Sequence, residues 1–209
     1  MNLKQNIVIV DYGVGNTQSV SNAIKFLGYT RVKISNEEIT IQNADALILP
    51  GVGAFEEAIN NLKDHNLDKT LNELVLIKKK PILGICVGMQ MLASYSYENG
   101  VHNGLNWIPG SVIKLETDES LTIPHVGWND VKFNKAAPLF TLNSNPSNFY
   151  FDHSFWYKCD DEANIAATVD YGREITAAVQ KDNIYGVQFH PEKSHISGFK
   201  FFRSFLNSV

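Results

Sequence analysis

Cysteine, long apolar runs and clustered charge are all scarce in this sequence. Its 209 residues include only two cysteines, Cys86 and Cys159, which are too few for a disulfide framework and suit a reducing, cytoplasmic location. No segment approaches the ~20 apolar residues of a membrane span. The apolar run at residues 7–10 is too short for a secretory signal. We therefore expect neither a secreted protein nor a membrane protein.

Signatures of nucleic-acid, metal and nucleotide binding are also missing. The formal net charge is -4, and the longest basic run is the three lysines at residues 78–80, so we expect no nucleic-acid partner. No histidine pair has the spacing of metal ligands. Residues 50–53 (PGVG) lack the Lys-Ser/Thr ending of a phosphate-binding loop, and residues 13–15 (GVG) lack the third glycine of a dinucleotide fingerprint. We expect neither a metal nor a cofactor.

The first half of the chain alternates between two hydrophobic periods. Residues 7–10, 46–49 and 82–86 are short continuous apolar runs, typical of parallel strands covered on both faces. Helical spacing of apolar residues lies around and between them, at Val20, Ala23, Ile24 and Leu27, at Phe55, Ala58, Ile59 and Leu62, and at Leu67, Leu71, Leu74 and Val75. The pattern predicts an α/β fold, with a doubly wound, largely parallel sheet and helices on both faces. Ligands bind such sheets beyond the carboxyl ends of the strands.

The second half is rich in β-branched and aromatic residues. Strands are predicted at residues 112–115, 131–133, 149–157, 165–169, 175–180 and 184–189. Phe199, Phe202 and Leu206 then indicate a closing helix. Hydrophobic residues make up 44% of the chain and charged residues 19%, and no linker or repeat interrupts it. We expect residues 1–209 to form a single domain.

The most informative stretch is residues 84–88 (GICVG), directly after the apolar run that ends the third predicted strand. A strand, a glycine-flanked residue and an immediate helix make the layout of a nucleophile elbow, which exposes the nucleophile above the sheet. Side chains at Gly84 or Gly88 would crowd the strand against the helix. The helix N-terminus also stabilises the thiolate form of Cys86. Cys159 lies among acidic residues instead, a setting that disfavours thiolate.

A candidate base and its orienting group lie far along the chain, in residues 188–192 (QFHPE). On an extended segment His190 and Glu192 point to the same side, and Pro191 between them stiffens the backbone. Cysteine, histidine and carboxylate together form a set for acyl transfer. Residues 50–53 and the amide of Val87 are placed to donate N–H groups to an oxyanion. His125 and His153, in aromatic-rich segments, are typical of packed, hydrogen-bonded core residues.

Residues 84–90 (GICVGMQ) with 186–194 (GVQFHPEKS) resemble the triad, or class I, glutamine amidotransferases. Residues 11–16 (DYGVGN), 49–55 (LPGVGAF) and 124–129 (PHVGWN) resemble the glutaminase subunit of imidazole glycerol phosphate synthase within that family. The motifs follow the family order from the first strand almost to the C-terminus. The resemblance therefore covers essentially the whole chain and implies a flavodoxin-like class I fold.

The resemblance implies an activity and a set of site residues. Cys86 attacks the side-chain amide of L-glutamine, His190 transfers protons, Glu192 orients His190, and glutamate and ammonia are released. The resemblance further assigns the oxyanion hole to the backbone of Val52 and Val87, glutamine binding to Gly51, Gly53, Gln90, His153, Ser154 and Phe155, and the partner interface to Asn16, Trp128, Tyr150 and Lys181. The partner is a separate (β/α)8 synthase subunit in a heterodimer, which receives ammonia through an internal channel. The products serve histidine biosynthesis.

Three other interpretations fit parts of the sequence. Asp152, where an apolar residue is common, and Phe155, where tyrosine is frequent, keep open a paralogous glutaminase serving a synthase that amidates a surface sugar. A non-catalytic redox-sensing or regulatory module would use Cys86 without needing Glu192. A stand-alone hydrolase of other amides would need no partner.

Overall fold

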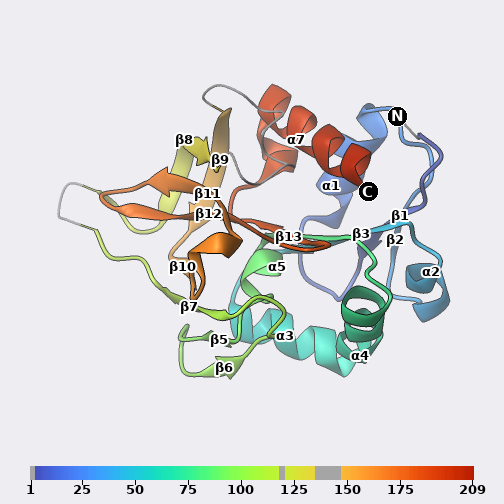
Figure 1. Cartoon of the computed structure of the whole chain (residues 1–209), viewed down its shortest axis with the longest axis horizontal. Helices are drawn as coiled ribbons and strands as arrows, with labels where there is room; N and C mark the ends of the chain where they lie inside the picture. The colour runs from blue at the N-terminus through green and yellow to red at the C-terminus, as the bar shows by residue number, and fades with distance from the viewer. Residues whose placement is uncertain (1–2, 118–120, 135–146) are drawn as a thin grey trace.

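The computed structural model describes residues 3–117, 121–134 and 147–209. Across these ranges the chain forms a nine-stranded sheet and a four-stranded sheet (Figure 1). In spatial order the large sheet contains β2 (Val32–Ser35), β1 (Ile7–Val10), β3 (Ala46–Gly51), β4 (Ile82–Cys86), β13 (Ile184–Val187), β12 (Glu174–Lys181), β11 (Ile165–Asp170), β8 (His125–Phe133) and β9 (Ser147–His153). The small sheet contains β10 (Phe155–Cys159), β7 (Gly110–Lys114), β5 (Tyr95–Ser96) and β6 (His102–Asn103).

The first five strands of the large sheet are parallel to one another. Every residue of β1, β3, β4 and β13 is buried, which explains their unbroken apolar sequences. The remaining strands pair antiparallel, so the sheet as a whole is mixed. The predicted α/β architecture is confirmed, with the parallel half built from the first part of the chain and completed by β13.

Helices cover both faces of the parallel strands (Figure 1). On one side lie α1 (Thr17–Phe26) and α7 (His195–Ser208), and on the other lie α3 (Phe55–Asp64), α4 (Leu67–Asn72) and α5 (Val87–Gln90). Short segments complete the order: α2 (Glu38–Gln42), the π-turn η1 (Glu73–Ile77), and the 3-10 turns η2 (Glu162–Asn164) and η3 (Pro191–Lys193). The helical face predicted across residues 67–75 therefore continues from α4 into η1.

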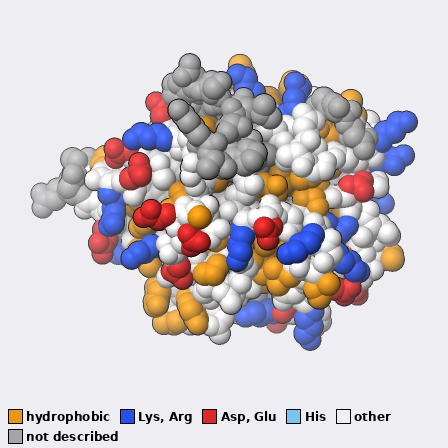
Figure 2. Space-filling model, viewed as in Figure 1, with side chains coloured by type: hydrophobic (Ala, Val, Ile, Leu, Met, Phe, Trp, Pro, Cys, Tyr) orange, Lys and Arg blue, Asp and Glu red, His pale blue; other side chains and the backbone are white. Residues whose placement is uncertain are grey.

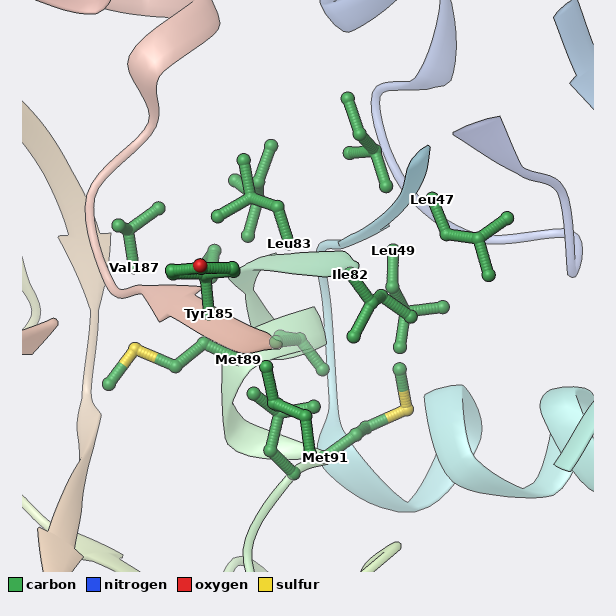
Figure 3. Close-up of a cluster of buried hydrophobic side chains, with 14 of the residues drawn as sticks. Leu47, Leu49, Ile82, Leu83, Met89, Met91, Tyr185 and Val187 are labelled. Atoms are coloured by element: carbon green, nitrogen blue, oxygen red, sulfur yellow. The ribbon is translucent and has the colours of Figure 1, made fainter. Parts of the chain in front are cut away.

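The core is centred on the strands that carry the site. Figure 3 shows apolar side chains from both faces of the sheet, with Leu47 and Leu49 from β3, Ile82 and Leu83 from β4, Tyr185 and Val187 from β13, and Met89 and Met91 from the region of α5. Close packing on both faces gives the ends of β3, β4 and β13 a rigid support.

Two local predictions differ from the structure. The strand predicted across residues 149–157 is two strands, because the chain leaves the large sheet after His153 and joins the small sheet at Phe155. The His153 imidazole bonds the Phe155 carbonyl two residues ahead, and this local turn interrupts the extended run. The second is the strand predicted at residues 184–189, which ends at Val187. The short elements β2, α2, β5 and β6 carry too few residues for a periodic signal and were not predicted.

On the face drawn in Figure 2, acidic and basic side chains are intermixed rather than gathered by sign. Within the described ranges, no helix has the length and apolar character needed to cross a bilayer.

Candidate active site

Cys86 occupies the sharp turn between β4 and α5. Its backbone has φ 55° and ψ −112°, a conformation that non-glycine residues rarely adopt and that stores strain at functional sites. A Cβ on Gly84 would lie 2.6 Å from the Gly88 carbonyl oxygen, and one on Gly88 would collide with the Leu49 carbonyl. The crowding between strand and helix predicted from these glycines is confirmed.

His190 and Glu192 lie beside Cys86 because β13 runs parallel to β4 and ends at the same edge. The His190 side chain hydrogen-bonds Cys86. Its Nδ1 lies 2.8 Å from Oε1 of Glu192, and the two side chains are only 3% and 1% exposed. Since Nδ1 faces the carboxylate, Nε2 is the ring nitrogen that faces the thiol. The structure brings the three predicted catalytic residues together.

The electrostatics of His190 favour its protonated form. Burial works against the charged imidazolium, but hydrogen bonds to Cys86 and Glu192, together with the negative charge of both partners, raise the pKa of His190 to about 10. At neutral pH His190 therefore holds its proton when Cys86 is ionised. The resting pair is a thiolate and an imidazolium, so the nucleophile needs no proton transfer before it attacks.

Ser194 fixes the backbone of His190, a role that the sequence did not reveal. The buried Ser194 hydroxyl donates to the His190 carbonyl at 2.6 Å and accepts from the Tyr150 N–H at 3.0 Å. The His190 N–H donates in turn to the Tyr150 carbonyl at 2.8 Å. These bonds tie the base to β9, a strand distant in sequence, so no local pattern could have indicated them.

A cavity of about 280 Å³ opens over the triad, close to the lower end of the volumes of small-molecule sites. It is lined by Val52, Gly53, Cys86, Val87, Gln90, Glu98, Pro124, Asp152, His153, Ser154, Phe155, His190 and Lys193. All the residues predicted to bind glutamine line it except Gly51. Gly51 is buried just behind, where a Cβ would lie 2.8 Å from the Gly88 nitrogen and from the Tyr12 hydroxyl.

Glu98 is a cavity residue that sequence analysis missed. Its Oε2 accepts the Phe55 N–H, at the start of α3, at 2.8 Å. The bond holds a carboxylate at the cavity wall, where it suits a cationic group of the ligand. Glu98 follows β5, a two-residue strand, and 43 residues separate it from Phe55, so its position depends on tertiary contacts.

The two predicted oxyanion residues both face the cavity. Val87 begins α5, where the first N–H groups have no partner within the helix. Val52 directly follows β3 and is 40% exposed. Behind it, the buried Tyr12 hydroxyl donates to the Pro50 carbonyl at 2.5 Å and so anchors the strand end that leads into Val52.

Residues predicted to meet a partner gather at the mouth of the cavity, with one exception. Trp128 is 46% exposed, lies edge-on to Tyr150 and stacks on His195. Lys193, which sequence analysis did not select, places its ammonium 5.2 Å from the Tyr150 ring. Asn16 caps α1, accepting the Ser19 N–H, at the same end of the sheet.

Lys181 lies elsewhere, so its predicted place on this surface is wrong. It ends β12 and pairs with Ile184, the first residue of β13. Ile184 in turn pairs with Ile82 at the start of β4, whereas Cys86 is at the end of that strand. Because β12 runs antiparallel to β13, Lys181 is at the opposite edge of the sheet.

Features outside this cavity offer no competing chemistry. Burial, with Asp160 and Asp161 nearby, raises the pKa of Cys159 to about 12, so it is an inert thiol as predicted. A larger hollow of about 770 Å³ beside Lys79 and Asp182 is lined by neither cysteine nor histidine. In the part of the chain that the structure describes, no His, Cys, Asp and Glu side chains cluster as a metal site.

Comparison with known sequences agrees with this geometry. The family model described as "Glutamine amidotransferase class-I" matches residues 8–207. Imidazole glycerol phosphate synthase subunit HisH 2 of Vibrio vulnificus is 46% identical over 203 residues, covering 97% of this chain and 94% of that protein. Subunit HisH 1 of Campylobacter jejuni is 46% identical over 200 residues, covering 96% and 98%.

Solved structures share the fold at lower identity. PurLQS from Thermotoga maritima superposes with a TM-score of 0.73 at 19% identity, covering 98% of this chain and 99% of that one. The glutaminase domain of CTPS from Trypanosoma brucei gives a TM-score of 0.64 at 16% identity, covering 96% and 93%. From the sequence matches over almost its whole length, the chain belongs to the class I glutamine amidotransferases and, within them, to the HisH subunits of imidazole glycerol phosphate synthase.

Proposed function

We propose that this protein hydrolyses L-glutamine to glutamate and ammonia, as the glutaminase subunit of imidazole glycerol phosphate synthase in histidine biosynthesis. One observation carries the proposal: Cys86, on a strained elbow, contacts the buried His190–Glu192 pair beneath a cavity of about 280 Å³. Membership of the HisH subunits supports the choice of glutamine as substrate and of this synthase as client.

The first half of the reaction forms a thioester. The Cys86 thiolate attacks the side-chain carbonyl carbon of glutamine, and the carbonyl electrons move to oxygen. The N–H groups of Val52 and Val87 stabilise this oxyanion. The oxyanion collapses, the C–N bond breaks, and the His190 imidazolium gives its proton to the departing nitrogen. Ammonia leaves, and His190 is left neutral.

The second half regenerates the enzyme. Neutral His190 accepts a proton from water as the water oxygen attacks the thioester carbon. The second oxyanion collapses with cleavage of the C–S bond, which releases glutamate and restores the Cys86 thiolate beside protonated His190. Glu192 holds the ring orientation and stabilises its positive charge throughout.

Charges on the cavity wall suit an amino-acid substrate. The Glu98 carboxylate is available to the α-ammonium group of glutamine, while Gln90 and the segment from His153 to Phe155 form the remaining wall. Glycine at position 53, with φ 86°, lets the backbone approach the ligand closely.

The partner in this proposal is a separate (β/α)8 synthase that docks on the cavity mouth and receives ammonia through a channel. Exposed apolar side chains surround the mouth, including Val52, Val126, Trp128 and Ile196. Occupancy of the synthase should raise glutaminase activity by completing the oxyanion hole, where one donor is worth roughly 2.7–4 kcal/mol. An unchanged glutaminase rate at saturating synthase substrate would contradict this coupling.

The main test measures glutamate release by the protein with its native synthase. Cys86→Ala should abolish turnover, and an electrophilic glutamine analogue should label the wild type once, at Cys86. Retention of most activity by Cys86→Ala would exclude the mechanism. Absence of labelling would instead favour the non-catalytic module.

A second client is favoured by the charges at the mouth. Asp152 and Lys193 both line the cavity there, and both are exposed. This charged surface suits a glutaminase serving a different synthase, such as one that amidates a surface sugar. Complementation of a histidine auxotroph lacking its glutaminase subunit, with the native synthase co-expressed, separates the two clients. Growth without histidine supports the first, and failure with an active, soluble pair supports the second.

A further inference from the structure

Two buried histidines outside the triad lie against each other behind the cavity wall. His125 of β8 is 2% exposed and His153 of β9 is 6% exposed. Nδ1 of His125 lies 3.1 Å from Nε2 of His153. The His125 ring is stacked between those of Phe151 and Tyr171, with centroids 4.7 and 3.9 Å away. The triad mechanism uses neither imidazole.

Their hydrogen bonds have one consistent direction. The His153 Nδ1 lies 2.8 Å from the Phe155 carbonyl, which only accepts, so Nδ1 carries the proton. Neutral His153 then accepts at Nε2, and His125 must donate from Nδ1. This leaves Nε2 of His125 as an acceptor, and the Asn129 amide nitrogen lies 3.5 Å from it.

Backbone groups fix the far end of this series. The Asn129 amide nitrogen also donates to the Asp170 carbonyl at 2.9 Å, and its oxygen accepts the Asp130 N–H at 2.8 Å. The Asn129 amide therefore cannot be turned round without losing both bonds. It presents a donor to His125, which agrees with the proton positions assigned from the other end.

The near end reaches the nucleophile. The Phe155 carbonyl that accepts from His153 also accepts from the Gln90 side-chain nitrogen at 3.0 Å. The same nitrogen donates to Gln188 at 3.1 Å, and the Gln188 amide nitrogen lies 3.7 Å from the Cys86 sulfur. Both Gln90 N–H groups are thus used, which leaves the Gln90 carbonyl oxygen free for a ligand.

Burial keeps both imidazoles neutral. It lowers the pKa of His125 to about 4. It also lowers the pKa of His153 to about 3, where the nearby His125 and His190 act in the same direction against the hydrogen bond to Phe155. A proton on Nε2 of His153 would face the N–H of His125, so each ring holds the other in its present tautomer.

We propose that His125 and His153 are positioning residues for glutamine binding. They hold the Phe155 carbonyl in place, and that carbonyl orients the Gln90 amide so that its oxygen faces the substrate and accepts an N–H of glutamine. This inference rests on the proposed glutaminase function. Loss of the His125 donor frees the His153 ring and then the Gln90 amide, which weakens ground-state binding more than chemistry.

The tautomers test the geometry without any assay of activity. Long-range ¹H–¹⁵N spectra of the isolated protein at pH 7 should show both rings neutral and protonated at Nδ1. An Nε2–H tautomer or an imidazolium at either ring would overturn the proposal. Because this measurement needs neither glutamine nor synthase, it stands even if the proposed function fails.

A pair of variants then separates hydrogen bonding from packing. His125→Phe keeps the ring stack and removes the donor, whereas His125→Asn keeps a donor near Nδ1 and removes the stack. In the complex, we expect His125→Phe to raise the glutamine KM about tenfold with kcat reduced less than threefold, and His125→Asn to recover most of the loss. Equal KM values in the two variants would contradict a positioning role, as would a wild-type KM in His125→Phe.

Tyr171→Phe is the matched control, since it keeps the ring on His125 and removes only the hydroxyl bond to the Thr122 carbonyl. Its KM should equal that of the wild type, and a tenfold increase would assign the effect to packing instead. Absence of glutaminase turnover in the wild-type complex would reject the proposed function. The spectra would still decide whether the hydrogen-bonded series exists.

Discussion

Two sides of the same cavity treat histidine in opposite ways. His190, His125 and His153 are all buried to a similar degree. Beside Cys86 and Glu192, His190 has a pKa raised to about 10, whereas burial lowers the pKa of His125 to about 4 and of His153 to about 3. The difference comes from their neighbours, because carboxylate and thiolate favour an imidazolium and another neutral imidazole does not. Burial alone therefore does not determine the charge of a histidine.

Removing the charged side should have the largest effect. His190→Ala should lower kcat for glutamine hydrolysis by about a thousandfold or more, because the leaving nitrogen and the attacking water both lose their proton carrier. Adding Cys86→Ala should cost little further, since the two residues act as a unit. Multiplicative losses in the double variant would show that they act independently.

Neutralising the carboxylate tests whether charge or shape orients His190. Glu192→Gln keeps the volume but removes the negative partner at 2.8 Å, so kcat should fall about a hundredfold and the pKa of His190 should decrease. The pH dependence of thiol alkylation at Cys86 reports this change. An unaltered profile would show that Cys86 alone sustains the charge on His190.

Acid should destabilise the neutral side. Below pH 6.5 the unfolded chain protonates His125 and His153 while the folded chain does not, so stability is lost as the pH falls from 6.5 towards 4. Each histidine contributes a slope of up to about 1.4 kcal/mol per pH unit. Urea unfolding between pH 6.5 and 5 measures it, and the slope should be smaller in His125→Phe. His190 acts oppositely, since its contribution is complete below pH 6.5 and is lost as the pH rises towards 10.

The smallest effect is expected at Tyr12, which borders the charged side without carrying charge. Tyr12→Phe leaves the buried Pro50 carbonyl unsatisfied, at a cost of about 1–3 kcal/mol in stability. The strand end before Val52 loses its anchor, so kcat should fall about fivefold while the glutamine KM stays constant. A change in KM alone would separate Tyr12 from the oxyanion hole.

Local sequence predicted the charged side of the site well. The elbow around Cys86 and the extended pair His190 and Glu192 each lie within a few residues, so glycine placement and strand periodicity were enough to select them. The parallel strands were predicted for the same reason, since burial on both faces makes their sequences continuously apolar.

Contacts between distant strands explain what was missed. Glu98 depends on the start of α3, Ser194 on β9, and the bond from His125 to His153 on the pairing of β8 with β9. Lys181 was misplaced because nothing in its own sequence shows which edge of the sheet β12 ends at. The partner-facing lysine at the mouth is Lys193, a position set by the turn after His190.

The passage of the chain from one sheet to the other has a mechanical consequence. Ser154 is the single residue between β9 and β10, and its carbonyl accepts the Leu115 N–H, just beyond β7, at 2.8 Å. The cavity wall is therefore also the seam that joins the two sheets. A ligand held across this seam clasps them together, so glutamine or a covalent adduct should slow amide exchange in β7 and β10, well away from the reacting sulfur.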